Sequence, residues 1–150
     1  MTSQRPAPDT AEHIEDLFDT LVAFRREVHA DPELSFEEFR TTDRIVEALE
    51  KAGLEPVRLQ DTGAYVDIGE GPFAIGLRAD IDALPVTEVT GLEFASQNKG
   101  VAHACGHDVH TTVMLGVALV LHRLNTEGRL NARVRVIFQP AEEKMPGGAK

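Results

Sequence analysis

The chain has 150 residues, of which 42% are hydrophobic and 27% are charged, and this composition fits a globular protein with a core of its own. Its 15 basic and 25 acidic residues give a formal net charge of −10, which argues against nucleic acid or an anionic membrane surface as a partner. A solvated acidic surface is the commonest cause of such a balance, and a carboxylate-rich site for a divalent cation is also compatible with it.

The number of cysteines and the lengths of the apolar runs indicate in which cellular compartment the protein is found. The single cysteine, Cys105, cannot form an internal disulfide. The first ten residues are polar, contain two prolines and lack the apolar core of a signal peptide. The longest mostly apolar run, Val113–Leu121, is too short to span a bilayer. We therefore expect a cytoplasmic protein without a membrane partner.

Two helices are predicted in the first third of the chain. Apolar residues at three- and four-residue spacing predict the first helix, and Asp31-Pro32 ends it because a residue before proline avoids the helical region. Ser35 and Glu38 have the spacing of a capping box, so Ser35 is expected to be the N-cap of the second helix, and Gly53 is typical of its C-terminal stop. The predicted segments are a disordered leader over residues 1–9, a helix over residues 10–30 and a second helix that follows the N-cap at Ser35 and runs to about Ala52.

The rest of the chain is predicted to alternate between strands and a helix. Strands are predicted over residues 55–59, 64–68, 73–79 and 132–139, and a third helix over residues 108–125. The strand over residues 73–79 is expected to be buried, and the third helix is apolar on more than one face and should be buried as well. Residues 86–102 are expected to be irregular. The pattern predicts an α/β fold in which helices pack on a mixed, largely parallel sheet.

Reactive side chains gather next to three of these elements. In open α/β sheets, sites form at the carboxyl ends of strands, so clusters that follow neighbouring strands are expected to meet at one edge. The clusters are Asp80 and Asp82 after the strand 73–79, Cys105 and His107 before the third helix, and Glu142 and Glu143 after the strand 132–139.

Cys105 and His107 predict half of a metal site. A sulfur and a nitrogen ligand suit zinc, and imidazole also suits other transition metals. Two alternatives remain for Cys105: a buried core thiol, or a nucleophile activated by His103 or His107 in a thiol hydrolase that needs no metal. Asp108 and His110 are expected near the site rather than as ligands. The remaining histidines, His13, His29 and His122, are assigned to packing or to the surface.

The two acidic clusters extend this hypothesis. Because Glu142 and Glu143 are adjacent, one carboxylate can bind a metal while the other faces a water molecule, which is what metal-assisted hydrolysis requires. Two solvated surface glutamates are the ordinary alternative. Asp80 and Asp82 could orient a ligand histidine or approach the metal, and the alternatives are a turn after the strand or an ion pair with Arg78.

Four motifs together resemble the peptidase M20 family, in its branch of hippurate hydrolases, N-acyl-amino-acid amidohydrolases and auxin-conjugate hydrolases. They occur in the family's order and with similar spacing, and they cover roughly residues 20 to 149. The resemblance implies a zinc-exopeptidase-like catalytic domain that cleaves the amide of an N-acyl amino acid or a similar conjugate. The motifs are Val22-Ala-Phe-Arg-Arg-Glu-Val-His-Ala-Asp-Pro-Glu-Leu-Ser-Phe36, Arg78-Ala-Asp-Ile-Asp-Ala-Leu-Pro85, His103-Ala-Cys-Gly-His-Asp-Val-His-Thr111 and Gln139-Pro-Ala-Glu-Glu143.

The resemblance also implies roles for individual residues. Cys105, His107 and Glu143 would be metal ligands, Glu142 the general base and Asp82 the aspartate that orients a ligand. Two divalent ions are implied for each full-length subunit, zinc or manganese, with nickel or cobalt as further candidates. The implied partners are a small N-acyl amino acid substrate and further copies of the full-length protein, as a dimer or a tetramer.

The family's remaining histidine ligands and its lid and dimerisation domain would lie beyond Lys150. Residues 10–150 are therefore expected to be the N-terminal part of the catalytic domain, with weak metal binding and no useful turnover on their own. The alternatives are a truncated member of the family without catalytic activity and the metal-independent thiol hydrolase based on Cys105.

Overall fold

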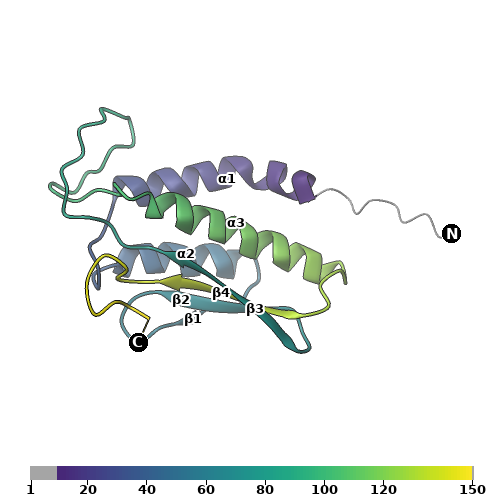
Figure 1. Cartoon of the computed structure of the whole chain (residues 1–150). Coiled ribbons are helices and arrows are strands. Elements are labelled where there is room, and N and C mark those ends of the chain that lie inside the picture. Colours follow the sequence, from purple (N-terminus) through teal and green to yellow (C-terminus); the bar gives the residue numbers. More distant parts are fainter. Residues whose placement is uncertain (1–9, 150) are drawn as a thin grey trace.

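The computed structural model describes residues 10–149, so the predicted leader over residues 1–9 lies outside the described part of the chain. The elements in chain order are α1 (Thr10–Ala30), α2 (Phe39–Lys51), β1 (Val57–Arg58), β2 (Ala64–Ile68), β3 (Phe73–Asp80), α3 (His107–Thr126) and β4 (Arg133–Gln139) (Figure 1). The bounds of α1 and β2 are those predicted, and the other strands and α3 differ from prediction by one to a few residues. None of the helices within residues 10–149 is long and apolar enough to cross a membrane.

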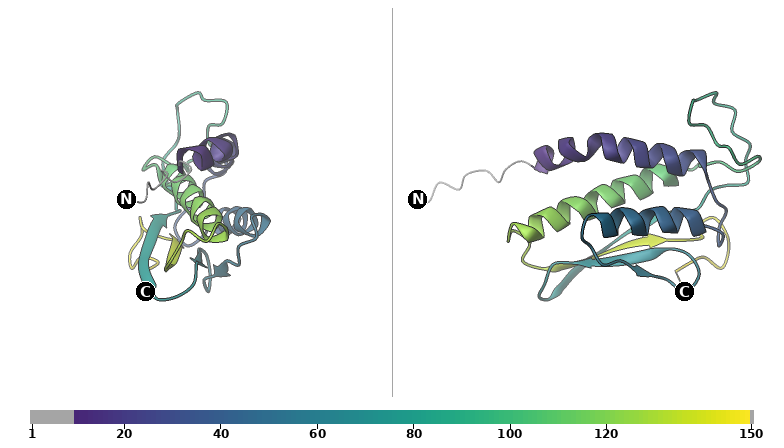
Figure 2. Two further views of the ribbon diagram at one scale, coloured as in Figure 1. Left: turned by 90° about the vertical axis from the view of Figure 1, so that its right-hand side faces the viewer. Right: turned by 180° about the vertical axis from the view of Figure 1, so that it is seen from behind.

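The strands form one sheet in the order β1-β2-β4-β3, with the helices on one of its faces (Figure 2). β4 pairs antiparallel with β2 and parallel with β3. The predicted α/β fold with a mixed sheet is confirmed. The expectation of a largely parallel sheet is wrong, because only one of the three strand pairs among residues 10–149 is parallel.

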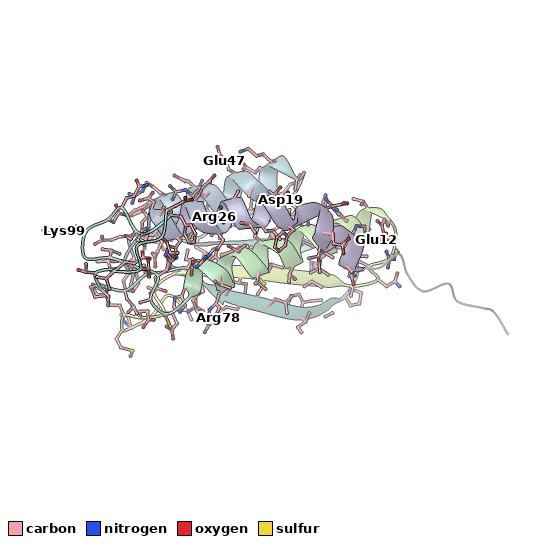
Figure 3. All side chains as sticks on the ribbon, turned by 90° about the horizontal axis from the view of Figure 1, so that it is seen from above. Glu12, Asp19, Arg26, Glu47, Arg78 and Lys99 are labelled. Atoms are coloured by element: carbon pink, nitrogen blue, oxygen red, sulfur yellow. The ribbon has the colours of Figure 1, made fainter. Side chains whose placement is uncertain are left out.

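The core lies between this sheet and the helices. α3 lies on the sheet beside α2, and α1 packs on α3, farther from the strands (Figures 1 and 2). Charged residues such as Glu12, Asp19 and Arg26 lie along the exposed side of α1, as Figure 3 shows from above. The most deeply buried apolar residues come from all of these layers: Val28, Ile45, Leu49, Val66, Ile68, Ile81, Leu115, Ala118, Val136 and Phe138.

Helix α2 begins at Phe39 with its N-cap at Glu38, three residues later than the predicted N-cap at Ser35, and the capping box is wrong. The Glu38 side chain makes no capping hydrogen bond, and the Glu33 carboxylate instead accepts hydrogen bonds from the Arg40 and Thr41 N–H groups, at 3.2 and 2.7 Å. The Ser35 hydroxyl donates to Asp82 instead. The fully buried Glu38 carboxylate accepts hydrogen bonds from the Thr62 hydroxyl and the Ala141 N–H, both at 2.7 Å. The side chains of Ser35 and Glu38 therefore form hydrogen bonds with residues distant in sequence instead of with the backbone at the start of the helix.

The prediction of a buried strand over residues 73–79 is also wrong for most of its length. β3 is an edge strand, and its first four residues are exposed, with Phe73 52% and Ile75 51% accessible to solvent. Only its last two residues, Ala79 and Asp80, are buried. Within the described residues β3 pairs with β4 alone, so its apolar composition does not produce burial there.

Candidate metal centre

The parallel pairing of β3 and β4 places two of the predicted clusters at one edge of the sheet. Asp80 lies opposite Gln139 in the register, so the segments that follow each strand leave the sheet side by side. The third cluster arrives with the start of α3 at His107. Gly106, the residue before the helix, has a left-handed backbone with φ of 89°, which glycine adopts at little cost and other residues avoid. The predicted convergence of the three clusters is therefore present.

Three of the predicted ligands come together at this edge. One donor atom each from Cys105, His107 and Glu143 lies within 4.8 Å of the other two. Zinc is held by sulfur at about 2.3 Å and by nitrogen or oxygen at about 2.0–2.2 Å, so small side-chain adjustments bring all three donors to one ion. Cys105 is exposed, His107 is buried and Glu143 is partly buried, which leaves the centre open on one side. The residues present thus fit a divalent metal ion.

Asp82 fixes the orientation of the His107 ring. The Nδ1 atom of His107 lies 2.9 Å from the Asp82 carbonyl oxygen and 3.2 Å from its Oδ1. The Asp82 carboxylate is itself held, because its Oδ2 accepts hydrogen bonds from the Ser35 hydroxyl at 2.6 Å and the Glu143 N–H at 2.9 Å. The Nε2 atom therefore faces the centre, where Glu142 Oε2 and Glu143 Oε1 each lie 3.9 Å away.

The pKa values of Asp82 and His107 are shifted in opposite directions by their surroundings. Burial opposes ionisation of Asp82, but hydrogen bonds from His107, Ser35 and the Glu143 N–H outweigh it and hold the pKa of Asp82 well below its usual range. The hydrogen bond to Asp82 raises the pKa of His107, against the opposite effect of burial. Asp82 is thus a permanent anion behind the histidine, the arrangement that orients a metal-binding imidazole.

The surroundings of Cys105 disfavour ionisation of its thiol when no cation is bound. Its hydrogen bond to Glu143, followed by burial and by the charges of Glu143, Glu142 and Asp80, raises the pKa of the thiol. Nucleophilic cysteines have lowered pKa values, usually beside a histidine cation or a helix N-terminus. A cation placed among these carboxylates would instead favour the thiolate. The electrostatics therefore disfavour the thiol hydrolase alternative.

Glu142 lies beside the three donors without belonging to that set. Its side chain is 42% exposed, compared with 23% for Glu143. Ala141, the preceding residue, has a φ of 52°, and its N–H is held by Glu38. The chain thus turns sharply between β4 and the two glutamates, and Glu142 remains accessible to water.

The other residues named in the sequence analysis lie around the centre. Arg78 donates a hydrogen bond to Asp80, so the predicted ion pair is present, and the Asp80 carbonyl accepts one from the Thr111 hydroxyl. His103 is buried, and neither of its ring nitrogens has a hydrogen-bond partner among residues 10–149. Burial is the main cause that lowers the pKa of His103 to about 4, so the ring is neutral at pH 7.

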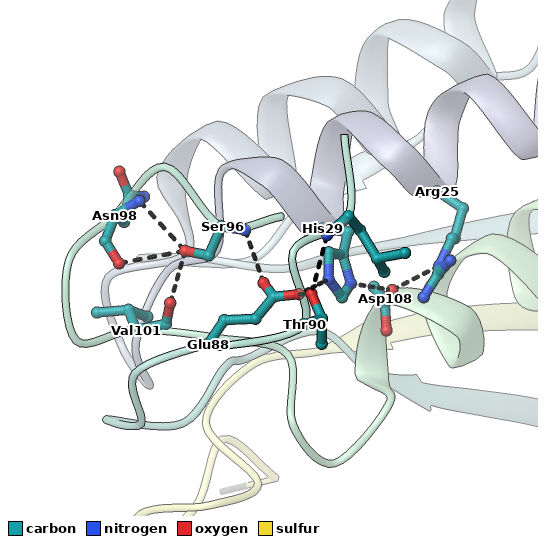
Figure 4. A network of polar contacts seen from close by, with 9 residues as sticks. Arg25, His29, Glu88, Thr90, Ser96, Asn98, Val101 and Asp108 are labelled. Atoms are coloured by element: carbon teal, nitrogen blue, oxygen red, sulfur yellow. Dashed lines mark hydrogen bonds and ion pairs between the residues drawn. The ribbon is translucent and has the colours of Figure 1, made fainter. Parts of the chain in front are cut away.

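His29, which the sequence analysis assigned to packing or to the surface, is part of a buried polar network (Figure 4). Its Nδ1 lies 2.8 Å from Asp108 Oδ2 and its Nε2 lies 3.1 Å from Glu88 Oε1. Arg25 Nε donates to the same Asp108 oxygen at 2.7 Å. The partners of His29 are 79 and 59 residues away along the chain, so no local pattern could identify them.

This network fixes the irregular segment over residues 86–102 against α1 and the start of α3. Glu88 also accepts hydrogen bonds from the Thr90 hydroxyl and the Ser96 N–H (Figure 4). The Phe94 ring lies under the guanidinium groups of Arg25 and Arg26, at 5.2 and 5.1 Å from its centroid. Polar and cation–π contacts thus stabilise a segment that lacks regular secondary structure.

The chain is similar to known proteins in sequence and in structure. Residues 76–150, half of the chain, match the model of the peptidase family M20/M25/M40. The N-acetyl-L-cysteine deacetylase of Bacillus subtilis is 49% identical over 135 residues, which are 87% of this chain and 32% of that protein. The N-acyl-L-amino acid amidohydrolase of Geobacillus stearothermophilus is 43% identical over 148 residues, which are 94% of this chain and 40% of that protein.

One solved structure and one further relative complete the comparison. The YXEP protein of Bacillus subtilis, a dinuclear metal binding peptidase from the M20 family, superposes with a TM-score of 0.82 at 42% identity, over 89% of this chain and 38% of its own. A Rhodococcus jostii protein that bears the name of a glutamate–cysteine ligase is 55% identical over 131 residues, but these are 16% of its length, so its name carries no argument for this chain. The chain spans about a third of the amidohydrolases that it matches, and it belongs to the peptidase family M20/M25/M40.

Proposed function

We propose that this chain supplies the general base and part of the metal ligand set of an amidohydrolase that cleaves the amide bond of N-acyl amino acids or similar conjugates. The observation that carries the proposal is the convergence of donor atoms from Cys105, His107 and Glu143 beside the exposed carboxylate of Glu142. The substrate class is supported by the two amidohydrolases to which the chain is similar, which act on N-acetyl-L-cysteine and on N-acyl-L-amino acids.

In this proposal Cys105, His107 and Glu143 hold a divalent ion. When bound, the ion supplies a lowered pKa for a water molecule and polarises the amide carbonyl. The thiolate favours zinc by its softness, and manganese, nickel and cobalt are the other candidates. The likeness to a dinuclear peptidase supports two ions in the whole protein. Their remaining ligands would come from polypeptide outside residues 1–150.

The protein's own groups move the proton. Glu142 Oε2 accepts a proton from the attacking water and returns it to the nitrogen of the departing amino acid as the C–N bond breaks. Asp82 holds His107 by Nδ1, so that Nε2 keeps its direction towards the centre during this exchange. The acyl group leaves as a carboxylate and the amino acid as a free amine.

The 150 residues correspond to only part of the similar amidohydrolases, and this limits what we propose for the chain on its own. Because they cover 32% and 40% of two similar amidohydrolases, closure over the substrate and assembly into an oligomer are assigned to the rest of a longer protein. For the 150-residue chain itself we propose metal binding without turnover. Cytoplasmic location also belongs to this proposal.

The test compares protein from the complete reading frame with the 150-residue chain, using N-acetyl amino acids as substrates. We expect the complete protein to release free amino acid, to lose this activity with EDTA and to regain it with zinc or manganese. Glu142→Gln should lower kcat by about 10²–10⁴-fold with the metal content unchanged, because a general base contributes that much. Glu70→Gln, which changes another exposed glutamate, is the matched control.

Three results would redirect the proposal. Full activity of the Glu142→Gln variant would refute the assignment of the base. Hydrolysis that persists in EDTA would favour the thiol mechanism, and Cys105→Ser would then abolish it. Metal binding without hydrolysis from the complete reading frame would instead support the truncated, non-catalytic member of the family.

A further inference from the structure

We propose that Asp80, His107 and His110 form a second, alternative position for a divalent cation beside the Cys105–His107–Glu143 centre. One donor atom from each of these three residues lies within 4.8 Å of the other two, as in the first set. Asp80 and His110 are not ligands in the proposed function. The inference deepens that function and rests on it in one respect, because both positions use His107.

The backbone fixes the relative placement of the three side chains. His107 and His110 are three residues apart in the first turn of α3, where residues at this spacing lie on the same side of a helix. Their ring centroids are 5.4 Å apart, with 31° between the planes. Asp80 is the last residue of β3, and its carbonyl oxygen accepts a hydrogen bond from Thr111 of the same helical turn at 3.1 Å. The set therefore joins a strand end to a helix start.

The two positions exclude each other at His107. Its Nδ1 is engaged by the carbonyl and carboxylate of Asp82, which leaves Nε2 as the nitrogen available to a metal. One nitrogen lone pair binds one ion. An ion held with His110 and Asp80 therefore takes His107 away from Cys105 and Glu143, and the reverse also holds.

The donor chemistry of the two positions differs. The first combines a thiolate with an imidazole and a carboxylate, and a thiolate selects soft or borderline ions such as zinc. The second combines two imidazoles with one carboxylate, the donor set of non-haem iron sites, and lacks sulfur. Manganese, which prefers oxygen and nitrogen donors, should therefore favour the second position, while zinc and cobalt favour the first.

Access and charge allow an ion to reach the second position. His110 is exposed to solvent, whereas Asp80 and His107 are buried. Arg78 competes for Asp80, but its side chain is 47% exposed, and an ion pair this accessible contributes little. A cation can displace the guanidinium from the carboxylate while Arg78 moves into solvent.

The experiment titrates the 150-residue chain with Co²⁺ and with Mn²⁺ separately. The thiolate-to-cobalt charge-transfer band reports binding through Cys105, and the loss of the electron paramagnetic resonance signal of aqueous Mn²⁺ reports manganese binding. We expect His110→Ala, and independently Asp80→Asn, to weaken Mn²⁺ binding at least about tenfold while the cobalt band is retained. Cys105→Ser should remove the band and leave Mn²⁺ binding within about twofold.

Controls separate this proposal from the proposed function. His122→Ala changes a histidine farther along α3 and should alter neither titration, and circular dichroism checks that each variant is folded. Unchanged Mn²⁺ binding in both His110→Ala and Asp80→Asn would overturn the second position alone. Loss of Mn²⁺ binding in Cys105→Ser would also overturn the second position, because manganese and cobalt would then both bind at the Cys105–His107–Glu143 centre. Failure of the wild-type chain to bind either ion would overturn the metal centre of the proposed function as well.

Discussion

Two buried histidines in this molecule have the same kind of partner on one side and different surroundings on the other. His29 Nδ1 is paired with Asp108, and His107 Nδ1 with Asp82. The Nε2 of His29 is also paired, with Glu88 at 3.1 Å. The Nε2 of His107 faces two carboxylates at 3.9 Å, beyond hydrogen-bond distance.

The difference separates a structural histidine from a candidate ligand. A ring that is satisfied at both nitrogens joins elements, and here it joins α1 to α3 and to the segment over residues 86–102. A ring fixed at one nitrogen and open at the other is prepared for a partner that the protein does not supply. We therefore expect changes around His29 to lower the stability of the fold and changes around His107 to lower metal affinity.

The largest effect is expected from His29→Ala. The substitution leaves Glu88 and Asp108, whose side chains are 7% and 1% exposed, without one of their cationic or donor partners. Loss of a hydrogen bond to a buried charged group costs about 1.5–3 kcal/mol, and His29 makes two of them, so the free energy of unfolding measured by urea denaturation with circular dichroism should fall by more than that. The exposed helix position His110→Ala should change the same quantity by less than about 0.5 kcal/mol. Equal losses in the two variants would contradict a structural role for His29.

The second effect concerns affinity. Asp82→Asn removes the anion that orients His107 and should weaken zinc binding by about 10–100-fold, as loss of such a partner does in metal sites. Isothermal titration with Zn²⁺ gives the value. Ser35→Ala removes only one hydrogen bond to Asp82 and should have a smaller effect in the same direction. Zinc affinity unchanged in Asp82→Asn would show that the ring does not depend on this carboxylate.

The third effect is a dependence of stability on pH. Burial alone would raise the pKa of Glu88, but hydrogen bonds from Thr90, the Ser96 N–H and His29 lower it from 4.5 to about 2. Because the folded-state pKa is the lower one, this carboxylate stabilises the fold above pH 4.5, and the contribution is lost as the pH falls towards 2. Glu88→Gln should therefore be less stable at pH 7, and its urea midpoint should fall less than that of the wild type over this window. Parallel curves would contradict the lowered pKa.

The smallest effect tests the thiol. Because its hydrogen bond to Glu143 raises the pKa of Cys105, iodoacetamide should modify it several-fold more slowly at pH 7 than it modifies glutathione. Glu143→Gln should speed the reaction, and saturating Zn²⁺ should block it in the wild type. Mass spectrometry measures each rate. Modification faster than that of glutathione would restore the nucleophilic alternative.

The sequence was sufficient where the determining pattern is local. The spacing of apolar residues predicted α1 from Thr10 to Ala30, and the turn residues before Ala64 helped to predict the start of β2. The convergence of the acidic and Cys-His clusters was also predictable, because strand ends at one edge of an α/β sheet lie close together. The identities of the ligands depended on the resemblance of the motifs, and they remain predictions.

The errors arose where partners are distant along the chain. Ser35 and Glu38 have the spacing of a capping box, yet their side chains bond to Asp82 and Ala141, which are 47 and 103 residues away. β3 is apolar enough for a buried strand, but the order of the strands places it at the edge. The partners of His29 are likewise fixed by the packing of α1 on α3, which periodicity alone does not specify.

The buried carboxylate of Glu38 has a consequence for how the candidate centre moves. It binds the Ala141 amide from the entry to α2, and Ala141 directly precedes Glu142 and Glu143. We expect that amide hydrogen to exchange slowly with solvent, because its acceptor is fully buried and the two groups must separate before exchange. The backbone before the two glutamates is therefore expected to open far less often than the exposed Glu142 side chain moves.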